Sequence, residues 1–471
     1  MSTSLDAAAE NEETSDGYHK SLGNRQVRMI AIGGAIGVGL FLGAGGRLAS
    51  AGPSLVLSYA VCGIAGFFVM RALAELVLYR PTSSSFVAYA REFIGPWAGF
   101  VTGWMYWLNW AGAGIAEITA VGYYMHKWLP QLPTWCTALA ALALLTSVNL
   151  LSVKLFGELE FWFSVVKVTA IVAFLVVGVA LVVNGVHLGS GGNQASVGNL
   201  VDHGGFFPTG IGLTLMTFQA VIFAYAGIEL VGVAAGEAKS ARTMIPKAVN
   251  SVLWRIGVFY VGSVLLLAML LPWSAYSKGE SPFVTVFSQL GVPAAGDVMN
   301  LIVLTAALSS ANSGLYSTGR MLRALADKGE APAFAGRMSK RKVPFGAIAV
   351  TGVVYLLGVV LNYVVPQDAF DVATEIASLG TLTTWAMLVI SQMGLRRAAL
   401  AGLIERPSYR MPGAPVTNWL TLGFLALVLV MMAFSGGSSM IAVCSIPVIC
   451  LVLWLGWRTV RARRPAPRIS G

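Results

Sequence analysis

The sequence predicts an all-α membrane protein whose chain crosses the lipid bilayer twelve times. Of its 471 residues, 56% are hydrophobic and only 11% are charged, against roughly 45–50% and about 25% in an ordinary soluble domain. The charged residues form short clusters between long apolar runs, which is typical of a polytopic membrane protein. This composition disfavours a soluble enzyme and a soluble nucleic-acid-binding protein.

The predicted spans are the runs that contain about the 20 apolar residues needed to cross a hydrocarbon core of roughly 30 Å. They cover residues 27–48, 53–78, 97–125, 134–153, 158–185, 209–236, 250–272, 297–324, 343–364, 370–394, 417–435 and 438–459. No stretch between neighbouring spans is long enough to hold a soluble domain.

The positive charges predict the orientation of the spans. With residues 1–26 as a cytoplasmic tail, 24 of the 31 Lys and Arg residues lie in cytoplasmic segments, three in outer segments and four within spans. The positive-inside rule therefore places both termini in the cytoplasm, including a basic C-terminal tail at 460–471. The net charge of +10 is thus explained by topology and needs no nucleic-acid partner. The acidic N-terminal tail lacks the basic region of a cleavable signal peptide, so we expect the first span to be retained.

Signatures of enzymes and metal sites are missing from the sequence. It contains no G-x-x-x-x-G-K-[ST] phosphate loop, no H-E-x-x-H and no G-x-S-x-G, so we expect neither an ATP-driven pump nor a hydrolase. The four cysteines have unrelated spacings in or beside apolar runs, which indicates neither a disulfide framework nor a metal site. We expect no enzyme activity, no metal and no cofactor.

Two spans contain interruptions that predict broken helices. These are Gly33-Gly34-Ala35-Ile36-Gly37-Val38-Gly39 in span 1 and Phe223-Ala224-Tyr225-Ala226-Gly227-Ile228-Glu229 in span 6. Because they are five spans apart and an odd repeat length inverts the second copy, residues 27–185 (spans 1–5) and 209–394 (spans 6–10) are expected to form an inverted repeat. Spans 11 and 12, at 417–459, are then additions. The alternative is that the glycines only permit close helix packing.

An unwound segment at the bilayer midplane exposes backbone groups that lipid cannot satisfy, so it must line a polar cavity or hold a ligand. A zwitterion supplies both kinds of partner, because a helix N-terminus favours a carboxylate and free carbonyls accept from an ammonium. We assign the carboxylate to the N–H groups of Gly37, Val38 and Gly39. We assign the ammonium to the carbonyls of Ala35, Phe223 and Ala226.

Three ionisable side chains lie deepest in the predicted spans, namely Glu117, Lys167 and Glu229. Such groups are costly in a membrane and are interpreted as functional by default. We assign the Lys167 ammonium to carbonyls freed near Gly33 and Ile36, in place of a sodium ion; the alternative is a lysine that bends to the inner interface. For the two carboxylates, the alternative to proton coupling is a structural hydrogen bond. All four histidines lie in tails or loops, so a coupled proton must use these groups or water.

Other charged and aromatic positions have simpler interpretations. Arg71 and Glu75 are four residues apart in span 2 and are expected to pair along the helix. Trp104, Trp107 and Trp110 have three-residue spacing in span 3, and an interfacial belt or packing stripe explains them at least as well as a pocket wall.

Several segments are similar to segments of a known protein family. They are KSLGNRQVRMIAIGGAIGVGLFLGAGG from Lys20, GWMYWLNW from Gly103, GELEFWFSVVK ending at Lys167, FAYAGIELVG from Phe223 and SSANSGLYSTGR ending at Arg320. These segments resemble the bacterial amino acid transporter family of the amino acid, polyamine and organocation superfamily, from about residue 18 through the last span. The segments ELVLYRPTSSSFVAYAREF from Glu75 and IPKAVNSVLWRIGVFYVGS from Ile245 are most similar to family members that carry L-asparagine. Members that carry D-serine, D-alanine and glycine are a close second.

The resemblance implies a leucine-transporter-like fold of five-plus-five inverted repeats, with broken helices 1 and 6 and two additional helices. It implies secondary active import of an amino acid, L-asparagine first, by proton symport with alternating access. An amino acid exchanger and a non-concentrating channel or sensor are the alternatives. The implied location is the bacterial inner (cytoplasmic) membrane. Beyond the amino acid and membrane lipid it implies no partner, no cofactor besides the coupled proton, and a monomer or weak homodimer.

The resemblance also implies roles for particular residues. The family's ligand positions fall on Gly37, Val38, Gly39, Phe223 and Ala226, and its span-5 lysine falls on Lys167. Val38 departs from the family pattern, since relatives often carry threonine or serine there. The side-chain pocket is expected to use Phe223 as a lid, with residues near Asn109, Ala113, Tyr225, Asn312 and Thr384.

Overall fold

The computed structural model describes residues 36–82, 85–151, 153–189, 192–230, 241–339 and 343–463. Within these ranges the chain is mostly helical, which confirms the predicted all-α class. The strands β1 (His187–Leu188) and β2 (Asn193–Gln194) pair antiparallel after the fifth predicted span.

The α-helices run in chain order as α3 (Val38–Phe41), α4 (Gly43–Ala51), α5 (Leu55–Tyr79), α6 (Ser85–Phe93), α7 (Pro96–His126), α8 (Thr134–Leu151), α9 (Val153–Val183), α10 (Gly210–Met216), α11 (Phe218–Ala224), α13 (Ala241–Arg255), α14 (Ser263–Leu270), α15 (Pro282–Ser288), α16 (Ala295–Asp327), α17 (Phe345–Val364), α18 (Ala369–Leu400), α19 (Val416–Phe434) and α20 (Gly437–Arg463). A π-helix, η4 (Ile256–Gly262), joins α13 to α14. Short 3-10 turns are η2 (Gly52–Ser54), η3 (Val197–Leu200), η5 (Trp273–Ala275) and η6 (Ala333–Gly336).

Nine helical segments of the described residues are long and apolar enough to cross a membrane. One of them, Val38–Tyr79, combines α3, α4 and α5; it includes the second predicted span and the part of the first from residue 38 onward. Neither α7 nor the short pair α10 and α11 is among the nine. The chain is therefore a multi-pass helical membrane protein, while the count of twelve spans and the inverted repeat stay predictions.

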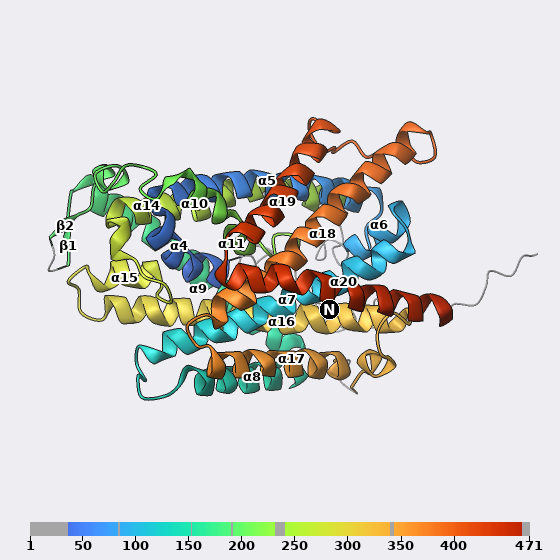
Figure 1. Cartoon of the computed structure of the whole chain (residues 1–471), viewed down its shortest axis with the longest axis horizontal. Helices are drawn as coiled ribbons and strands as arrows, with labels where there is room; N and C mark the ends of the chain where they lie inside the picture. The colour runs from blue at the N-terminus through green and yellow to red at the C-terminus, as the bar shows by residue number, and fades with distance from the viewer. Residues whose placement is uncertain are drawn as a thin grey trace, which may run out of the picture.

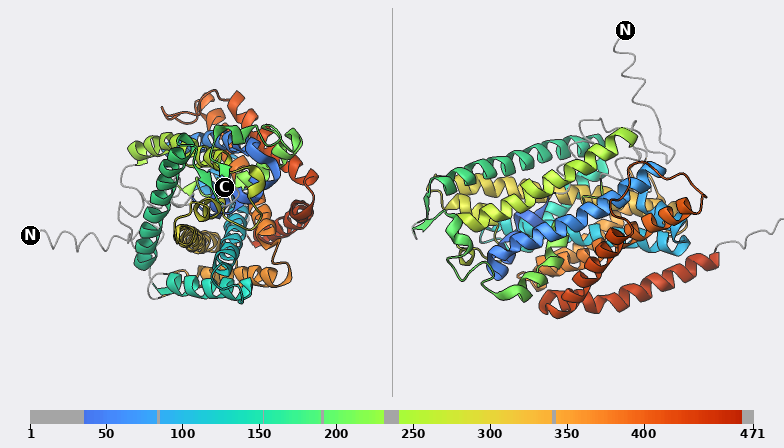
Figure 2. Two further views of the ribbon diagram at one scale, coloured as in Figure 1. Left: turned by 90° about the vertical axis from the view of Figure 1, so that its left-hand side faces the viewer. Right: turned by 90° about the horizontal axis from the view of Figure 1, so that it is seen from above.

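The centre of the bundle is formed by α7, which packs most extensively against α18 and α16. Figure 1 shows the long helices side by side along the long axis, and Figure 2 shows the same bundle from its end and from above. In the most apolar 18-residue stretch of α16, and in that of α18, 72% of the residues are buried. In the corresponding stretch of α20, 11% of the residues are buried. Apolar side chains such as Leu357, Leu420 and Val452 are exposed on the outer helices, as expected where lipid replaces protein contacts.

Glycine allows α7 and α18 to approach closely. A Cβ added at Gly380 would lie 2.6 Å from the Met105 carbonyl oxygen and 2.7 Å from the Asn109 nitrogen, and one added at Gly112 would lie 3.1 Å from the Ala373 carbonyl oxygen. Small residues at such contacts are typical of membrane helix pairs. The close contact fixes the α7 side chains that face the interior.

The predicted pair between Arg71 and Glu75 is wrong. The Glu75 carboxylate is fully buried and accepts from Arg406 Nε (2.6 Å), from Gln392 Nε2 (2.8 Å) and from the Met411 N–H (2.8 Å). Arg71 donates instead to the Arg410 carbonyl. The segment between α18 and α19 holds Arg406, Arg410 and Met411 beside this part of α5, and it offers each of the two side chains a separate partner.

Candidate functional site

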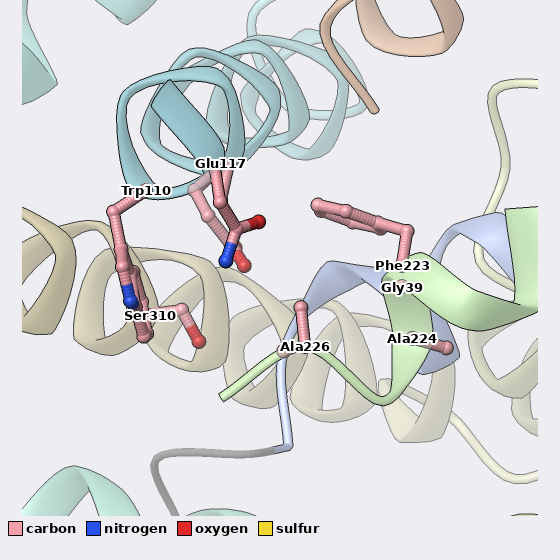
Figure 3. A pocket seen from close by; sticks show the side chains of 10 residues that line it. Gly39, Trp110, Glu117, Phe223, Ala224, Ala226 and Ser310 are labelled. Carbon is pink, nitrogen blue, oxygen red and sulfur yellow. The ribbon is translucent and has the colours of Figure 1, made fainter. Parts of the chain in front are cut away.

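A cavity lies where α3, α7, α11 and α16 meet. Its walls consist of Gly37, Gly39, Asn109, Trp110, Ala113, Glu117, Phe223, Ala224, Ala226 and Ser310. Figure 3 shows the Phe223 ring reaching in from α11, facing Glu117 and Trp110 of α7. The predicted residues Gly37, Gly39, Asn109, Glu117, Phe223 and Ala226 are thus brought together in one place.

At the span-1 interruption, Gly37 has extended backbone (φ −130°, ψ −162°) and caps α3, which begins at Val38. The Val38 N–H donates to Glu117 Oε1 at 3.3 Å. The N-terminus of α3, which the sequence assigned to a ligand carboxylate, therefore faces a carboxyl group of the protein itself. Ile36 is fully buried just before the cap, and Ala35 lies outside the described residues.

At the span-6 interruption, α11 ends at Ala224 and the chain turns through Gly227, whose φ of +94° favours glycine. Both carboxyl oxygens of Glu229 accept from the Gly227 N–H, at 3.2 and 3.1 Å. Glu229 is buried but is not part of the cavity wall. These contacts give it the structural hydrogen bond that was the alternative to proton coupling.

Gly37 and Gly39, both predicted at the site, lie against different kinds of neighbouring atoms. A Cβ at Gly39 would lie 2.6 Å from the Ala224 Cα, so α3 and α11 touch backbone to backbone there. A Cβ at Gly37 would meet the ends of two side chains, Glu117 Oε1 at 2.6 Å and Ser310 Oγ at 2.8 Å. Gly39 therefore serves close packing, whereas Gly37 leaves room for the Glu117 carboxyl.

Lys167 is fully buried, and its Nζ lies 4.0 Å from Oε1 of the equally buried Glu160. Glu160 Oε1 also accepts from Ser309 Oγ of α16 at 2.8 Å. The alternative of a lysine that bends to the membrane interface is wrong. Glu160 is therefore also held in the interior, against α16. Of the predicted carbonyl partners, Gly33 lies outside the described residues.

Two predicted pocket residues face elsewhere. The Tyr225 hydroxyl donates to the Tyr59 carbonyl at 2.8 Å, and its ring packs 4.8 Å from that of Tyr260. Asn312 Oδ1 accepts from Asn149 of α8 at 2.8 Å. Residues two apart on a helix differ by about 200° in direction, so α16 turns Ser310, not Asn312, to the cavity.

Trp110 is the cavity residue that the sequence left ambiguous. Trp104 and Trp107 pack against each other with ring centroids 5.6 Å apart, and they contact the cluster formed by Leu322, Ala335 and Ala347. Trp110 lies further along α7 and lines the cavity. The three tryptophans therefore do not act as one stripe.

Two further cavities continue from the central one, and each shares at least one wall residue with the cavity before it. Phe223 also lines a second cavity with Gly39, Gly43, Arg47, Tyr59, Ala220, Phe370 and Thr374. Arg47 lines a third, larger cavity that reaches Lys278, on the side that the charge distribution predicts to be outside. Between them, Arg47 of α4 pairs with Asp371 of α18 at 3.1 Å.

The fold and the cavity define a polytopic helical membrane protein with a small polar site at two helix interruptions. The family model described as amino acid permease matches residues 26–470. The chain belongs to the amino acid permease family, which confirms the family predicted from the sequence. Membership indicates a transporter rather than an enzyme, with an amino acid as its small-molecule substrate.

Curated relatives match nearly the whole chain. L-asparagine permease of Escherichia coli (strain K12) is 55% identical over 454 residues, which cover 95% of this chain and 90% of the relative. L-asparagine permease of Streptomyces coelicolor is 53% identical over 462 residues, covering 96% and 94%. L-asparagine permease 2 of Mycobacterium tuberculosis is 52% identical over 451 residues, covering 95% and 92%.

Proposed function

We propose that this protein is a secondary active transporter that imports L-asparagine by proton symport with alternating access, in a bacterial cytoplasmic membrane. The names of relatives at 52–55% identity support the substrate. The observation that carries the mechanism is the contact between the Val38 N–H and the Glu117 carboxyl at the central cavity.

In this proposal the substrate carboxylate and the Glu117 carboxyl group compete for the same donor, the Val38 N–H. The donors at the start of α3 favour one negative group. When the amino acid arrives, its carboxylate takes the N–H groups of Gly37, Val38 and Gly39, and its ammonium takes the carbonyls of Ala35, Phe223 and Ala226. Glu117 must then leave the helix N-terminus. A proton on Glu117 removes the repulsion between the two carboxyl groups, so substrate and proton bind together.

The side chain of asparagine suits the polar atoms that remain in the cavity. Ser310 Oγ and Trp110 Nε1 are buried with no hydrogen-bond partner among the described residues. Asn109 already accepts from Thr381 Oγ1 at 3.0 Å, which leaves its amide N–H groups to the cavity. A carboxamide both donates and accepts, and buried polar groups normally require such partners.

The Lys167–Glu160 pair supplies a fixed cation close to the cavity. A buried ammonium that holds unwound backbone in place of a sodium ion makes uptake independent of sodium. Of the three predicted proton-coupling residues, Glu117 is the one on the cavity wall. We therefore place the proton on Glu117, with Lys167 as its electrostatic neighbour and Glu229 as the residue that shapes the span-6 turn.

Uptake into proteoliposomes loaded only with buffer tests this function. Labelled L-asparagine should accumulate above its external concentration when an inward proton gradient is imposed, and should only equilibrate without it. Uptake that requires internal amino acid would indicate an exchanger, and equilibration under both conditions would indicate a channel or sensor. Competition by unlabelled D-serine, D-alanine, glycine and L-glutamine distinguishes the substrates.

A further inference from the structure

The end of α20 on the predicted cytoplasmic side carries a positive charge that the protein does not balance. Arg458, Arg461 and Arg463 are all exposed, and no Asp or Glu follows Glu405 in the sequence. None of the three arginines has a carboxylate partner within the part of the chain that the structure describes. Other arginines predicted on this side do have one, in the pairs Arg80–Glu92, Arg91–Glu330, Arg323–Asp327 and Arg406–Glu75.

One face of α20 packs on the bundle and another turns outward. A Cβ added at Gly456 would lie 3.0 Å from the Phe100 ring of α7, and Gly456 is turned by about 200° from Trp454. Trp454, Arg458 and Arg461 are four and three residues apart, so they share one face of the helix, and all three are exposed. Figure 2 shows α20, in red, at the edge of the bundle. The outward face, formed by Trp454, Arg458 and Arg461 and called the α20 basic face, therefore meets the surrounding membrane.

An aromatic ring holds the first of these arginines in place. Arg458 Cζ lies 4.7 Å from the centroid of the Trp454 ring, which is 52% exposed. Tryptophan is enriched at the depth of the lipid head groups, so the stacked guanidinium lies at that depth. Stacking uses the flat face of a guanidinium and leaves the N–H groups on its edge for phosphate oxygens. Arg461 lies one turn further, about 4.5 Å along the helix axis, where it can reach the same phosphate.

We propose that the α20 basic face binds the head group of an anionic phospholipid. The phosphate lies between Arg458 and Arg461. The acyl chains pack on Leu451 and Leu455, which are 54% and 48% exposed on the same side of the helix and lie deeper in the membrane. A soluble phosphate would leave these apolar side chains uncovered. A zwitterionic head group would place its ammonium beside a guanidinium, so the site favours a head group without positive charge.

The proposed lipid site has a consequence for the packing of α20. Of the residues in the most apolar stretch of this helix, only 11% are buried, so the protein itself makes few contacts with it. Trp457, next to Arg458, packs with its ring centroid 5.7 Å from that of Phe100 of α7. A lipid bound at Arg458 and Arg461 therefore stabilises the contact between α20 and α7.

Native mass spectrometry of the purified full chain tests the proposal, with dioleoylphosphatidylglycerol or dioleoylphosphatidylethanolamine titrated into the detergent. The wild type should bind the first phosphatidylglycerol at least about tenfold more tightly than phosphatidylethanolamine. R458Q/R461Q should bind phosphatidylglycerol about 25-fold more weakly than the wild type, because each basic side chain near an anionic lipid contributes about fivefold. R337Q/R463Q is the matched control and should bind as the wild type does. It removes the same charge from two exposed arginines, and Arg463 is turned by about 180° from Trp454.

Three outcomes would overturn the proposal. Equal binding of the two lipids by the wild type is one, and wild-type affinity in R458Q/R461Q is another. Equal weakening in both double variants is the third, because it would show attraction by net charge alone. An excess of inorganic phosphate should leave the lipid adduct in place, and its displacement would show a site for soluble phosphate instead.

Discussion

The backbone N–H of Val38 donates to the carboxyl group of Glu117, so the first turn of α3 is held to the middle of α7. The contact joins the start of a broken helix to a long central one and lies on the wall of the central cavity. In the mechanism that we propose, a ligand carboxylate that takes the same N–H releases α3 from α7. Binding, protonation and helix movement would then be linked at one hydrogen bond.

Glu117→Gln should separate binding from proton coupling. Glutamine keeps the size of the side chain but carries no charge and cannot release a proton. The variant should bind asparagine at least as well as the wild type and should exchange labelled for unlabelled asparagine. Accumulation driven by a proton gradient should fall to the level measured without the gradient.

Glu229→Gln is the matched control for this experiment, because Glu229 contacts the Gly227 turn and not the cavity. It should retain most of the proton-driven accumulation. If the two variants behave the other way round, the coupled proton resides on Glu229.

Lys167→Met should destabilise the protein by about 3–5 kcal/mol, because it leaves Glu160 buried without its cation. The double variant Lys167→Met/Glu160→Gln should recover most of that loss, since neither charge then remains. Chemical denaturation of the purified variants measures the coupling between the two residues. Equal stability of the single and double variants would show that the pair is not coupled. Uptake by the wild type should be equal in sodium and potassium buffers.

Gly37→Ala and Gly39→Ala should fail in different ways. At Gly39 the new methyl group meets the Ala224 backbone, and overpacking of this kind costs roughly 1–3 kcal/mol. At Gly37 it meets two side-chain ends that can swing aside, so the protein should melt normally. The methyl group should instead weaken asparagine binding about tenfold, because it occupies space through which the ligand carboxylate reaches the N–H groups at the start of α3, and one hydrogen bond to a charged group is worth about that much. A melting temperature for Gly39→Ala equal to that of the wild type would refute the packing role.

Glu75→Ala should lower the stability by about 3 kcal/mol, because it removes the partner of a largely buried Arg406 and of two further donors. Glu405→Ala removes the same charge from an exposed position in the same segment and should change the stability by less than about 0.5 kcal/mol. Thermal unfolding of both variants checks the difference. Equal effects would mean that Glu75 does not anchor the segment between α18 and α19.

Composition and glycine placement were enough to predict the helical membrane class and the two interruptions. Long apolar runs cannot be hidden in a soluble domain, and glycines at mid-span mark Gly37 and Gly227, where the backbone departs from a helix. The main wall residues on α3 and α11 followed from those interruptions.

The rest depends on contacts between distant segments. Glu75 is 331 residues from Arg406 in the sequence, and local spacing suggested Arg71 instead. Glu160 is bound in the interior by Ser309, which is 149 residues away in the sequence. Asn312 was predicted to line the pocket, but Ser310 lines it. Predicting this correctly requires knowing how α16 is rotated about its axis, which an apolar run does not specify.

The central claim is that asparagine is carried through the cavity between α3, α7, α11 and α16. The most direct test is proton-driven accumulation of labelled L-asparagine in buffer-loaded proteoliposomes containing the wild type, Ala113→Leu or Ala143→Leu. Ala113 lines the cavity, whereas Ala143 is exposed on α8. We predict that the wild type and Ala143→Leu accumulate asparagine equally and that Ala113→Leu loses at least about 90% of it, a tenfold effect that corresponds to roughly 1.4 kcal/mol of binding. Equal accumulation by a folded Ala113→Leu would contradict the claim.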